Sequence, residues 1–412
     1  MKKILFSMLA MLAVASTAFG IGDNAITVSD ITLSNSGNPS ALLVNINLTE
    51  KSSAKGMAFS IDLPAGVVFV TEGEKPVCHT GSMWGVPPTL NLKSSSSLTL
   101  TCASSDYIKG SKGLLYAFKI KATSPSSFTD GQTLIGGRIY DVSASISGAP
   151  VNLSKSNFNI TITSCDVVLD ENSPFAPETT GDDKVKILVK RTLTKDQWST
   201  ICLPFAIKSV DFASKFGTGV KLATFDSYSS DDNFETMSIN FVELKTEGNL
   251  TTGDVFLIKP SIDVTQFTYN AKVTRTSAPT KLYDVEEYDE DEGDNVEVEK
   301  GKFIGTYVAD IYVPENDMFI SDNSFYYSIG TSKIKGFRGY FWFKDKLKNT
   351  SAARAFISIG GDDATNIQAA KFSMIENGKV YTVSGQYVGE NIDIKRLPKG
   401  VYIVDGVKVV NE

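Results

Sequence analysis

Histidine is nearly absent, since His79 is the single one among 412 residues. This scarcity excludes most catalytic triads and most histidine-based metal sites, because both need an imidazole next to other reactive groups. His79 directly follows Cys78, and adjacent residues of an extended strand point to opposite faces, so a nucleophilic dyad is not expected. No SxxK element stands in a helical setting either. The sequence therefore predicts no cofactor and no catalytic constellation.

Excess basic charge and long apolar runs are lacking too. The formal net charge is -7 and the isoelectric point is near 5.1, whereas nucleic-acid binding needs a basic stripe. After residue 20, no segment approaches the roughly 20 apolar residues that a membrane span requires. We therefore expect no nucleic-acid partner and no membrane span after residue 20.

The first 20 residues have the pattern of a secretory signal peptide. Lys2 and Lys3 precede an apolar run from Ile4 to Val14, and small residues follow up to Gly20. The expected cleavage point lies near Gly20, and no cysteine stands directly after it, so the lipid anchor of a bacterial lipoprotein is not expected. The pattern predicts an exported protein.

Only four cysteines are present. An oxidising compartment favours disulfides over free thiols, and four cysteines allow three connectivities. Proximity in sequence favours Cys78 with Cys102 and Cys165 with Cys202, and each closed loop would contribute roughly 3 kcal/mol. A zinc site is the less favoured alternative, because no CxxC spacing exists.

The chain is too long for one core, since single cores stop growing at about 250 to 300 residues. Two polar stretches with proline or glycine, 164–183 and 360–366, are typical of linkers. They predict domains at 21–163, 184–362 and 366–412. Recurrent short runs of β-branched and alternating apolar residues predict an all-β fold: two antiparallel β-sandwich-like domains and a small C-terminal β module.

The N-terminal block carries a family resemblance. Its runs MAFSIDLPAGVVFV, KGSKGLLYAFKIKA and NFNITIT occur in an order that resembles a cohesin-like bacterial surface sandwich, over about 140 residues. In the first run, Phe59, Ile61 and Leu63 would face the core, and Pro64 would end the strand. The resemblance implies a binding or scaffold module and no chemistry.

The middle block is also rich in residues that favour strands, and only Val210 to Phe216 reads as a short helix. Its stretches TICLPF, GDVFLIKP and GFRGYFWF resemble a β-rich module common in Bacteroidales surface proteins. That resemblance supplies no biochemical role.

One strand of this block offers candidate binding residues. In GFRGYFWFK (336–344), a period of two places Phe337, Phe341 and Phe343 on one face. The other face would present Tyr340 and Trp342 as a platform for a sugar ring, with the cations Arg338 and Lys344 as donors. The alternative is that both faces are covered by protein. Trp84, in GSMWGVPP, is a separate candidate in an exposed loop.

Acidic residues raise two further hypotheses. The run DVEEYDEDEGDNVEVE (284–299) offers Asp289, Asp291 and Asp294 as weak candidates for calcium ligands, although Gly293 falls one position short of EF-hand spacing. A solvated loop between strands is the favoured interpretation. Glycoside hydrolysis would need two carboxylates about 5 to 9.5 Å apart, and 47 acidic residues make such pairs expected by chance.

The last 45 or so residues predict a small module of hairpins. Asn377-Gly378 and Asp405-Gly406 are strong hairpin signals, because both central residues of a type I′ turn need positive φ. The stretches VYTVSGQYV and LPKGVYIVDGVKVV resemble the C-terminal sorting domain of type IX secretion (Por) cargo in Bacteroidetes. The matching positions are Tyr381, Gly385, Val388, Leu397, Gly400, Tyr402, Val404, Gly406 and Lys408.

These observations predict a non-enzymatic, exported surface or secreted binding protein, adhesin-like or glycan-binding. The resemblance to the sorting domain implies transit through the periplasm to the outer-membrane surface or the outside of the cell, with the secretion machinery as a partner. The other expected partner is a surface glycan or a host or cell-surface protein. Two alternatives stay open: an extracellular glycoside hydrolase with paired carboxylates, and a structural component of surface fibres that exposes a strand edge.

Overall fold

The computed structural model describes residues 24–346, apart from gaps at 49–53, 106–107, 109–111, 125–126, 147–148, 152, 245–249, 276–279, 290–293 and 322. Beyond 346 it describes 354–359, 368–372, 379–382, 387–390, 398, 400–404 and 407–411. Residues 1–20, the expected signal peptide, lie outside these ranges.

Nearly all regular structure is β, which confirms the predicted fold class. The α-helix of the described residues is α1 (Phe212–Phe216), which follows a 3₁₀ turn at Ser209–Asp211, as the sequence predicts. No helix among the described residues is long and apolar enough to cross a membrane. By their contacts the residues divide into two compact units. The first comprises the residues up to Ile31, Leu42–Ile120 and Thr133–Ile160, and the second comprises Thr32–Ala41, Lys121–Gln132 and the residues from Thr161 onward.

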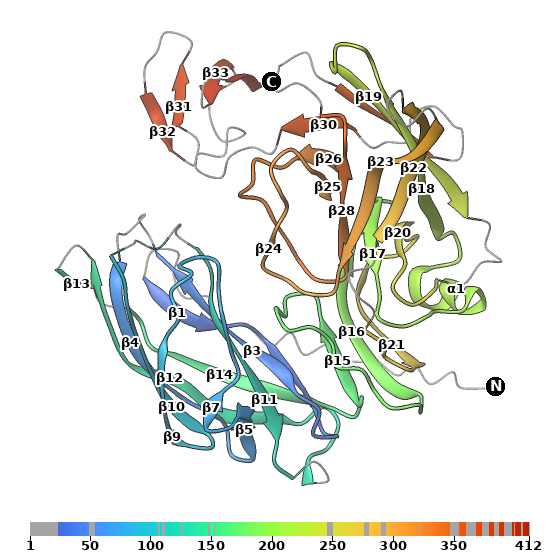
Figure 1. Cartoon of the computed structure of the whole chain (residues 1–412). Helices are drawn as coiled ribbons and strands as arrows, with labels where there is room; N and C mark the ends of the chain where they lie inside the picture. The colour runs from blue at the N-terminus through green and yellow to red at the C-terminus, as the bar shows by residue number, and fades with distance from the viewer. Residues whose placement is uncertain are drawn as a thin grey trace, which may run out of the picture. The chain divides into compact units, whose positions relative to one another are not determined.

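Two sheets make up the N-terminal sandwich (Figure 1). The five-stranded sheet has the order β1 (Ala25–Val28), β3 (Ser40–Asn47), β11 (Lys112–Ala122), β5 (Val67–Phe69), with β8 (Cys78–Thr80) also on β11. The seven-stranded sheet has the order β2 (Ile31–Ser34), β14 (Ser156–Thr163), β12 (Thr133–Ile146), β4 (Ala54–Asp62), β10 (Ser97–Ala103), β9 (Thr89–Ser94), with β13 (Ala149–Val151) on β12. A small ribbon joins β6 (Thr71–Glu72) to β7 (Lys75–Pro76).

Alternation along β10 and β4 separates core residues from those of the outer face, although Ser60 of β4 is also buried, at 1% exposure. On β10, Leu98 and Leu100 are fully buried while their neighbours are partly exposed. On β4, Phe59 and Ile61 are fully buried, and Leu63 just beyond is 6% exposed, as predicted. Because side chains alternate along a strand, the same pattern fixes which residues the sheet offers to its surroundings.

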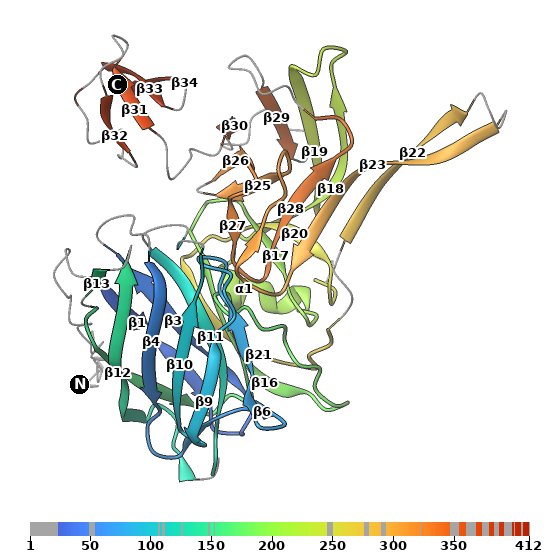
Figure 2. The same cartoon turned by 60° about the vertical axis from the view of Figure 1, so that its left-hand side comes forward.

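Besides the C-terminal sheet, the second unit contains a five-stranded, a six-stranded and a three-stranded sheet (Figure 2). The first has the order β17 (Ser199–Cys202), β20 (Val255–Lys259), β18 (Lys221–Ser230), β19 (Thr236–Leu244), β29 (Arg354–Ile359). The second has the order β22 (Thr280–Asp289), β23 (Asp294–Thr306), β28 (Arg338–Phe343), β25 (Met318–Ser321), β26 (Ser324–Tyr327), β30 (Gln368–Phe372). The third joins β15 (Val167–Asp170), β16 (Val185–Leu193) and β21 (Val264–Ala271), and a small ribbon joins β24 (Ile311–Tyr312) to β27 (Lys333–Ile334).

Aromatic rings join the two largest sheets of this unit. Phe341 of β28 is fully buried. Its ring centroid lies 4.1 Å from that of Phe303 on β23, 5.7 Å from that of Phe241 on β19 and 6.2 Å from that of Phe225 on β18. Such pairs add stability beyond the burial of their area. Phe341 therefore lies at the centre of this core.

Three features differ from the sequence-based expectations. The expected linker 164–183 contains strand β15, whose Leu169 is buried in the core. The strand pairs β15–β16, β19–β29 and β26–β30 are parallel, so the middle block is a mixed structure. The four cysteines are free, so the predicted disulfides Cys78–Cys102 and Cys165–Cys202 are absent. Three of the thiols lie in buried positions, where they pack as small apolar groups.

The C-terminal strands form a sheet with each other, in the order β32 (Tyr387–Glu390), β31 (Lys379–Thr382), β33 (Gly400–Val404), β34 (Val407–Asn411). Val404 pairs with Val407, so the strands flank a two-residue connection at the predicted Asp405-Gly406 hairpin. Strand β30 is different, because it pairs with β26 of the middle block.

Replacement of Phe341 with alanine should destabilise the second unit by about 3–5 kcal/mol, because it leaves a cavity among rings from both sheets. The change Val242→Ala, at a side chain that is 49% exposed, is the control and should cost about 0.5 kcal/mol or less. Urea unfolding followed by tryptophan fluorescence measures both. Equal losses would mean that Phe341 does not centre the core.

Candidate functional site

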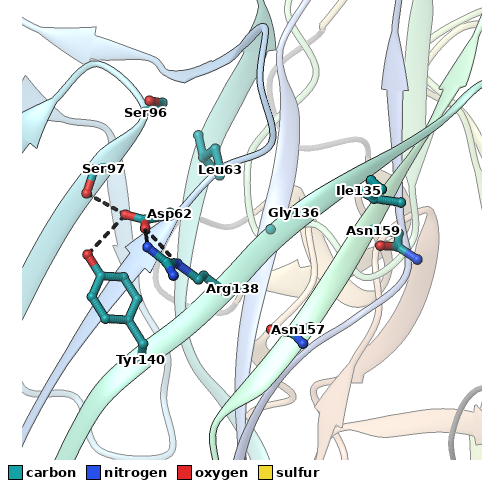
Figure 3. A pocket seen from close by; sticks show the side chains of 11 residues that line it. Asp62, Leu63, Ser96, Ser97, Ile135, Gly136, Arg138, Tyr140, Asn157 and Asn159 are labelled. Carbon is teal, nitrogen blue, oxygen red and sulfur yellow. Dashed lines mark hydrogen bonds and ion pairs between the residues drawn. The ribbon is translucent and has the colours of Figure 1, made fainter.

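A hollow of about 830 Å³ lies on the outer face of the seven-stranded sheet, within the first unit (Figure 3). Strands β4, β10, β12 and β14 contribute its lining. Its polar side chains include Asp62, Ser97, Arg138, Tyr140, Asn157 and Asn159.

Strand register brings the central polar group together. Asp62 ends the central strand β4, where it pairs with Ser97 of β10 on one side and with Arg138 of β12 on the other. Directly paired residues point to the same face, so their side chains meet. Tyr140 lies two residues beyond Arg138 and therefore on the same face.

The Asp62 carboxylate accepts four hydrogen bonds (Figure 3). Ser97 Oγ donates to Oδ1 at 2.6 Å and Tyr140 Oη donates to the same oxygen at 3.1 Å. Arg138 donates to Oδ2 through Nε at 2.8 Å and Nη2 at 2.6 Å. Such charge-assisted bonds are the stronger kind. They hold the guanidinium in one place on an otherwise open surface.

These contacts shift the pKa of Asp62. Burial alone would raise that pKa, but hydrogen bonds from Ser97, Arg138 and Tyr140, with the positive charge of Arg138, hold it below its ordinary value. In turn, the hydrogen bond and the charge of Asp62 raise the pKa of Arg138. Both groups are therefore ionised at neutral pH.

The Tyr140 ring also contacts the Arg138 guanidinium. The Arg138 guanidinium carbon lies 4.6 Å from the ring centroid, and Lys93 Nζ lies 5.7 Å from it. A planar guanidinium stacks well on an aromatic face. The contacts with Asp62 and Tyr140 preorganise the Arg138 side chain. That side chain is still 56% exposed, so it is also accessible to a partner.

The other half of the hollow is lined by glycine, amide and apolar groups. Gly136 has a φ of +98°, and a Cβ there would meet nothing within 4 Å, so the strand leaves an open floor. Next to it, a Cβ on Gly137 would come within 2.4 Å of the Phe158 ring. Asn157 and Asn159 stand on the exposed face of β14, and the Ile135 side chain is 75% exposed.

This arrangement suits recognition better than bond cleavage. Asp62 is the one carboxylate among the residues that line the hollow, and its lowered pKa disqualifies it as a proton donor at neutral pH. The side chains instead offer a fixed cation, amide donors and acceptors, and an exposed apolar group. Such a mixture is typical of a binding surface with oriented polar contacts.

None of these residues was among the sequence-based candidates. The sequence did contain one signal of this site. Asp62 stands at an outward position of the alternating stretch FSID (59–62), and an acidic residue there needs a cation or water as its partner. Its partner Arg138 is 76 residues away, and only the pairing of β4 with β12 brings the two together.

The predicted aromatic strand has the predicted alternation. Phe337, Phe341 and Phe343 are buried to 2% exposure or less, whereas Arg338, Tyr340 and Trp342 are partly exposed and Lys344 is exposed. Phe337 has a φ of +58° just before β28 begins. The role of Tyr340 and Trp342 in glycan binding stays a prediction.

Trp84 is not an exposed platform, contrary to the expectation from its loop sequence. It is 3% exposed, and Met83 beside it is 5% exposed. The Gly85 amide donates to the Gly81 carbonyl, and the Gly81 amide donates to Leu115 of β11. This turn is therefore tied to the sheet, and its apolar side chains are buried.

Of the calcium candidates, Asp289 ends β22 and Asp294 begins β23, and the two residues pair with each other. Asp294 Oδ1 accepts a hydrogen bond from the Asn295 amide at 2.8 Å, and Asp291 lies outside the described residues. Across the described part of the chain, no three His, Cys, Asp or Glu residues are arranged to hold a metal ion.

Cys78 and His79 are consecutive on β8, and the Cys78 thiol lies 3.7 Å from the His79 carbonyl oxygen. Burial raises the pKa of Cys78 to about 12 and that of Cys102 to about 11. Burial likewise raises the pKa of Cys202. At neutral pH these three groups are therefore protonated thiols. Nucleophilic attack needs the thiolate, so none of the three is an activated nucleophile.

The sorting-motif positions lie partly in the described strands. Tyr381 is on β31, Val388 on β32 and Lys408 on β34, while β33 carries Gly400, Tyr402 and Val404. Tyr402 is buried, and its hydroxyl donates to the Pro398 carbonyl at 2.8 Å. Gly385, Leu397 and Gly406 lie outside the described residues.

No protein-family model and no curated protein matches this chain. Among solved structures, a non-cellulosomal cohesin from the archaeon Archaeoglobus fulgidus is 16% identical; the match covers 34% of this chain and 92% of that chain, with a TM-score of 0.28. The sixth cohesin of Acetivibrio cellulolyticus scaffoldin B, in complex with a Cel5 dockerin mutant, is 15% identical over 34% and 99%, with a TM-score of 0.29. A cohesin module of a Clostridium perfringens family 33 glycoside hydrolase is 10% identical over 34% and 96%, with a TM-score of 0.27.

These matched structures belong to the family that the N-terminal sequence resembles. The sandwich architecture of the first unit follows from its own strand pairing and burial.

Acid should weaken the first unit through Asp62. Its pKa is depressed in the folded state, so its stabilising contribution is complete above the unfolded pKa of about 4 and is lost as pH falls through the lower folded pKa. The wild type should therefore exceed Asp62→Asn in free energy of unfolding by up to about 1 kcal/mol at pH 7. The gap should close below pH 4 or so.

The matched control is Asp232→Asn, at an exposed carboxylate of the second unit, which should leave the unfolding of the first unit unchanged. Urea unfolding at a series of pH values measures both variants. A gap for Asp62→Asn that is constant down to the lowest pH would contradict the depressed pKa.

Proposed function

We propose that this chain is an exported, non-enzymatic binding protein whose N-terminal sandwich recognises a partner protein. The observation that carries the proposal is the hollow on the outer face of the seven-stranded sheet, where Asp62 and Tyr140 fix the Arg138 guanidinium in an exposed position. An exposed arginine held by its own carboxylate loses little conformational entropy when it binds, which favours affinity. Arginine is also enriched in protein interfaces.

The composition of the hollow supports a protein partner. Asn157 and Asn159 project from alternate positions of β14, so they can donate to and accept from a partner's polar groups. Ile135 adds an apolar contact that is 75% exposed. The open floor at Gly136 leaves room for a side chain of the partner.

The hydrolase alternative finds less support at this site. Glycoside hydrolysis needs two carboxyl groups with different roles, whereas the lining contributes Asp62 alone and that carboxylate is engaged by Arg138. The adhesin-like role therefore stands as the preferred proposal.

Export and surface delivery complete the proposal. The N-terminal signal pattern and the terminal stretches VYTVSGQYV and LPKGVYIVDGVKVV support them. The sheet β32-β31-β33-β34 adds a structural argument, because its described strands pair only with each other and can serve as a separate module.

Two substitutions should weaken partner binding. Ile135→Asp and Arg138→Ala should each weaken binding at least about 10-fold, since interface anchors commonly contribute more than 1 kcal/mol. The test uses the mature chain against an array of purified bacterial and host surface proteins. Lys112→Ala, at an exposed residue of the other sheet, is the control. Protein binding that ignores both substitutions, or no protein binding at all, would contradict the proposal.

Deletion of residues 379–412 should block surface delivery. This cut removes β31 to β34 and preserves β30, which the middle block needs for its pairing with β26. The truncated chain should fold and accumulate in the periplasm, as measured by cell fractionation and surface proteolysis. A truncated chain on the surface at wild-type levels would disprove the sorting role and leave the binding proposal untouched.

A further inference from the structure

The outer face of β28 and its neighbours combines aromatic rings with cations. Tyr340 pairs with Ile304 of β23 and with Phe319 of β25, and Trp342 pairs with Lys302 of β23. Phe319 in turn stacks on Tyr326, with ring centroids 5.7 Å apart. All these rings are partly exposed, so an aromatic row crosses three strands on the face opposite the Phe341 core.

Two ammonium groups flank the end of this row. Lys302 Nζ lies 5.3 Å and Lys346 Nζ lies 5.4 Å from the centroid of the Trp342 ring. Lys346 Nζ also contacts the buried Asp317 carboxylate at 2.9 Å, which anchors it there. Lys302 Nζ likewise contacts the Glu299 carboxylate at 2.7 Å. The charges at this end of the row are therefore balanced, and the end offers a sugar an indole ring with two ammonium donors beside it.

At the other end of β28, three cations share one carboxylate. Glu171 is 3% exposed, and its Oε2 accepts from Arg191 Nη1 at 3.2 Å and from Arg338 Nη2 at 2.9 Å. Lys335 Nζ contacts Oε1 at 3.1 Å. Among the described residues no other carboxylate pairs with these three cations, so the cluster has two more positive than negative charges.

The buried member of this cluster is fixed. Arg191 is fully buried, and its Nη2 donates to the Thr200 carbonyl at 2.8 Å and to Ser199 Oγ at 3.1 Å. Burial and the nearby charge of Arg338 lower the pKa of Arg191 to about 9. Its Nε and that of Arg338 are buried and donate to no described acceptor. The electrostatic cost of this excess charge would fall if an anion bound beside it.

Only two of the three cations are accessible. The side chains of Arg338 and Lys335 are 21% and 50% exposed. Arg338 and Trp342 are four residues apart on one face, which is roughly 13 Å along a strand. A ligand that contacts both ends must therefore be an extended molecule.

We propose that this face of the second unit binds an acidic glycan. Its carboxylate or sulfate groups would pair with Arg338 and Lys335, and a sugar ring would pack on Tyr340 and Trp342 beside Lys302 and Lys346. Arginine and lysine recognise both kinds of oxyanion. This site is separate from the hollow around Asp62, so each proposal can fail without the other.

Affinity electrophoresis of the mature chain tests the proposal with three polymers. Polygalacturonate carries carboxylates, dextran sulfate carries sulfates, and dextran is neutral. We expect retardation by at least one acidic polymer and none by dextran. The acidic polymer that retards the chain more identifies the favoured oxyanion. Equal retardation by dextran, or none by either acidic polymer, would overturn the proposal.

Substitutions locate the binding. Lys335→Gln and Trp342→Ala should each raise the dissociation constant about 10-fold, while Trp342→Phe keeps an aromatic ring and should lose less. The matched control is Lys221→Gln, which removes a charge of similar exposure (53%) on another sheet. Circular dichroism checks that each variant is folded. Equal loss in the Lys221→Gln control would mean unspecific charge attraction, and full binding by Trp342→Ala would rule out a stacked sugar; either result overturns the proposal.

Discussion

The two-residue period of the β-strand is the constraint on which the rest of this structure depends. Each strand that buries one row of side chains must present the next row outward. On β28 the inner row places Phe341 among rings from both sheets, and the outer row consequently presents Arg338, Tyr340 and Trp342. On β4, buried Phe59 and Ile61 require Asp62 to face outward. The core and the candidate binding surfaces are thus two consequences of one pattern.

Both surfaces use the same physical device, a cation held in position by a partly or fully buried carboxylate. Asp62 holds Arg138 on the first unit, and Glu171 holds Arg338 and Lys335 on the second. A charge held in this way loses little entropy on binding, yet stays able to meet a partner. The two surfaces differ in net charge. Asp62 and Arg138 neutralise each other, whereas Glu171 neutralises only one of its three cations and leaves two positive charges uncompensated. This difference favours a protein partner at the first surface and an anionic ligand at the second.

The local part of this structure could be predicted from the sequence, and the long-range part could not. Alternation predicted the buried Phe337, Phe341 and Phe343, and the Asp405-Gly406 signal predicted the β33–β34 hairpin, because both depend on neighbours in the chain. Trp84 was placed wrongly, since its burial depends on how the turn at Gly81 pairs with β11. The Asp62–Arg138 and Glu171–Arg338 contacts span 76 and 167 residues, and no local pattern encodes such pairing. The parallel partners of β16, β19 and β26 were missed for the same reason.

The central claim is that the first unit recognises a protein through the outer face of its seven-stranded sheet. Hydrogen–deuterium exchange of the mature chain, with and without a captured partner protein, tests it most directly. The account predicts that slower exchange on binding is confined to the segments that line the hollow: the end of β4, the start of β10, and the parts of β12 and β14 around Arg138 and Asn157. Slower exchange only on the five-stranded sheet, or only in the second unit, would contradict it.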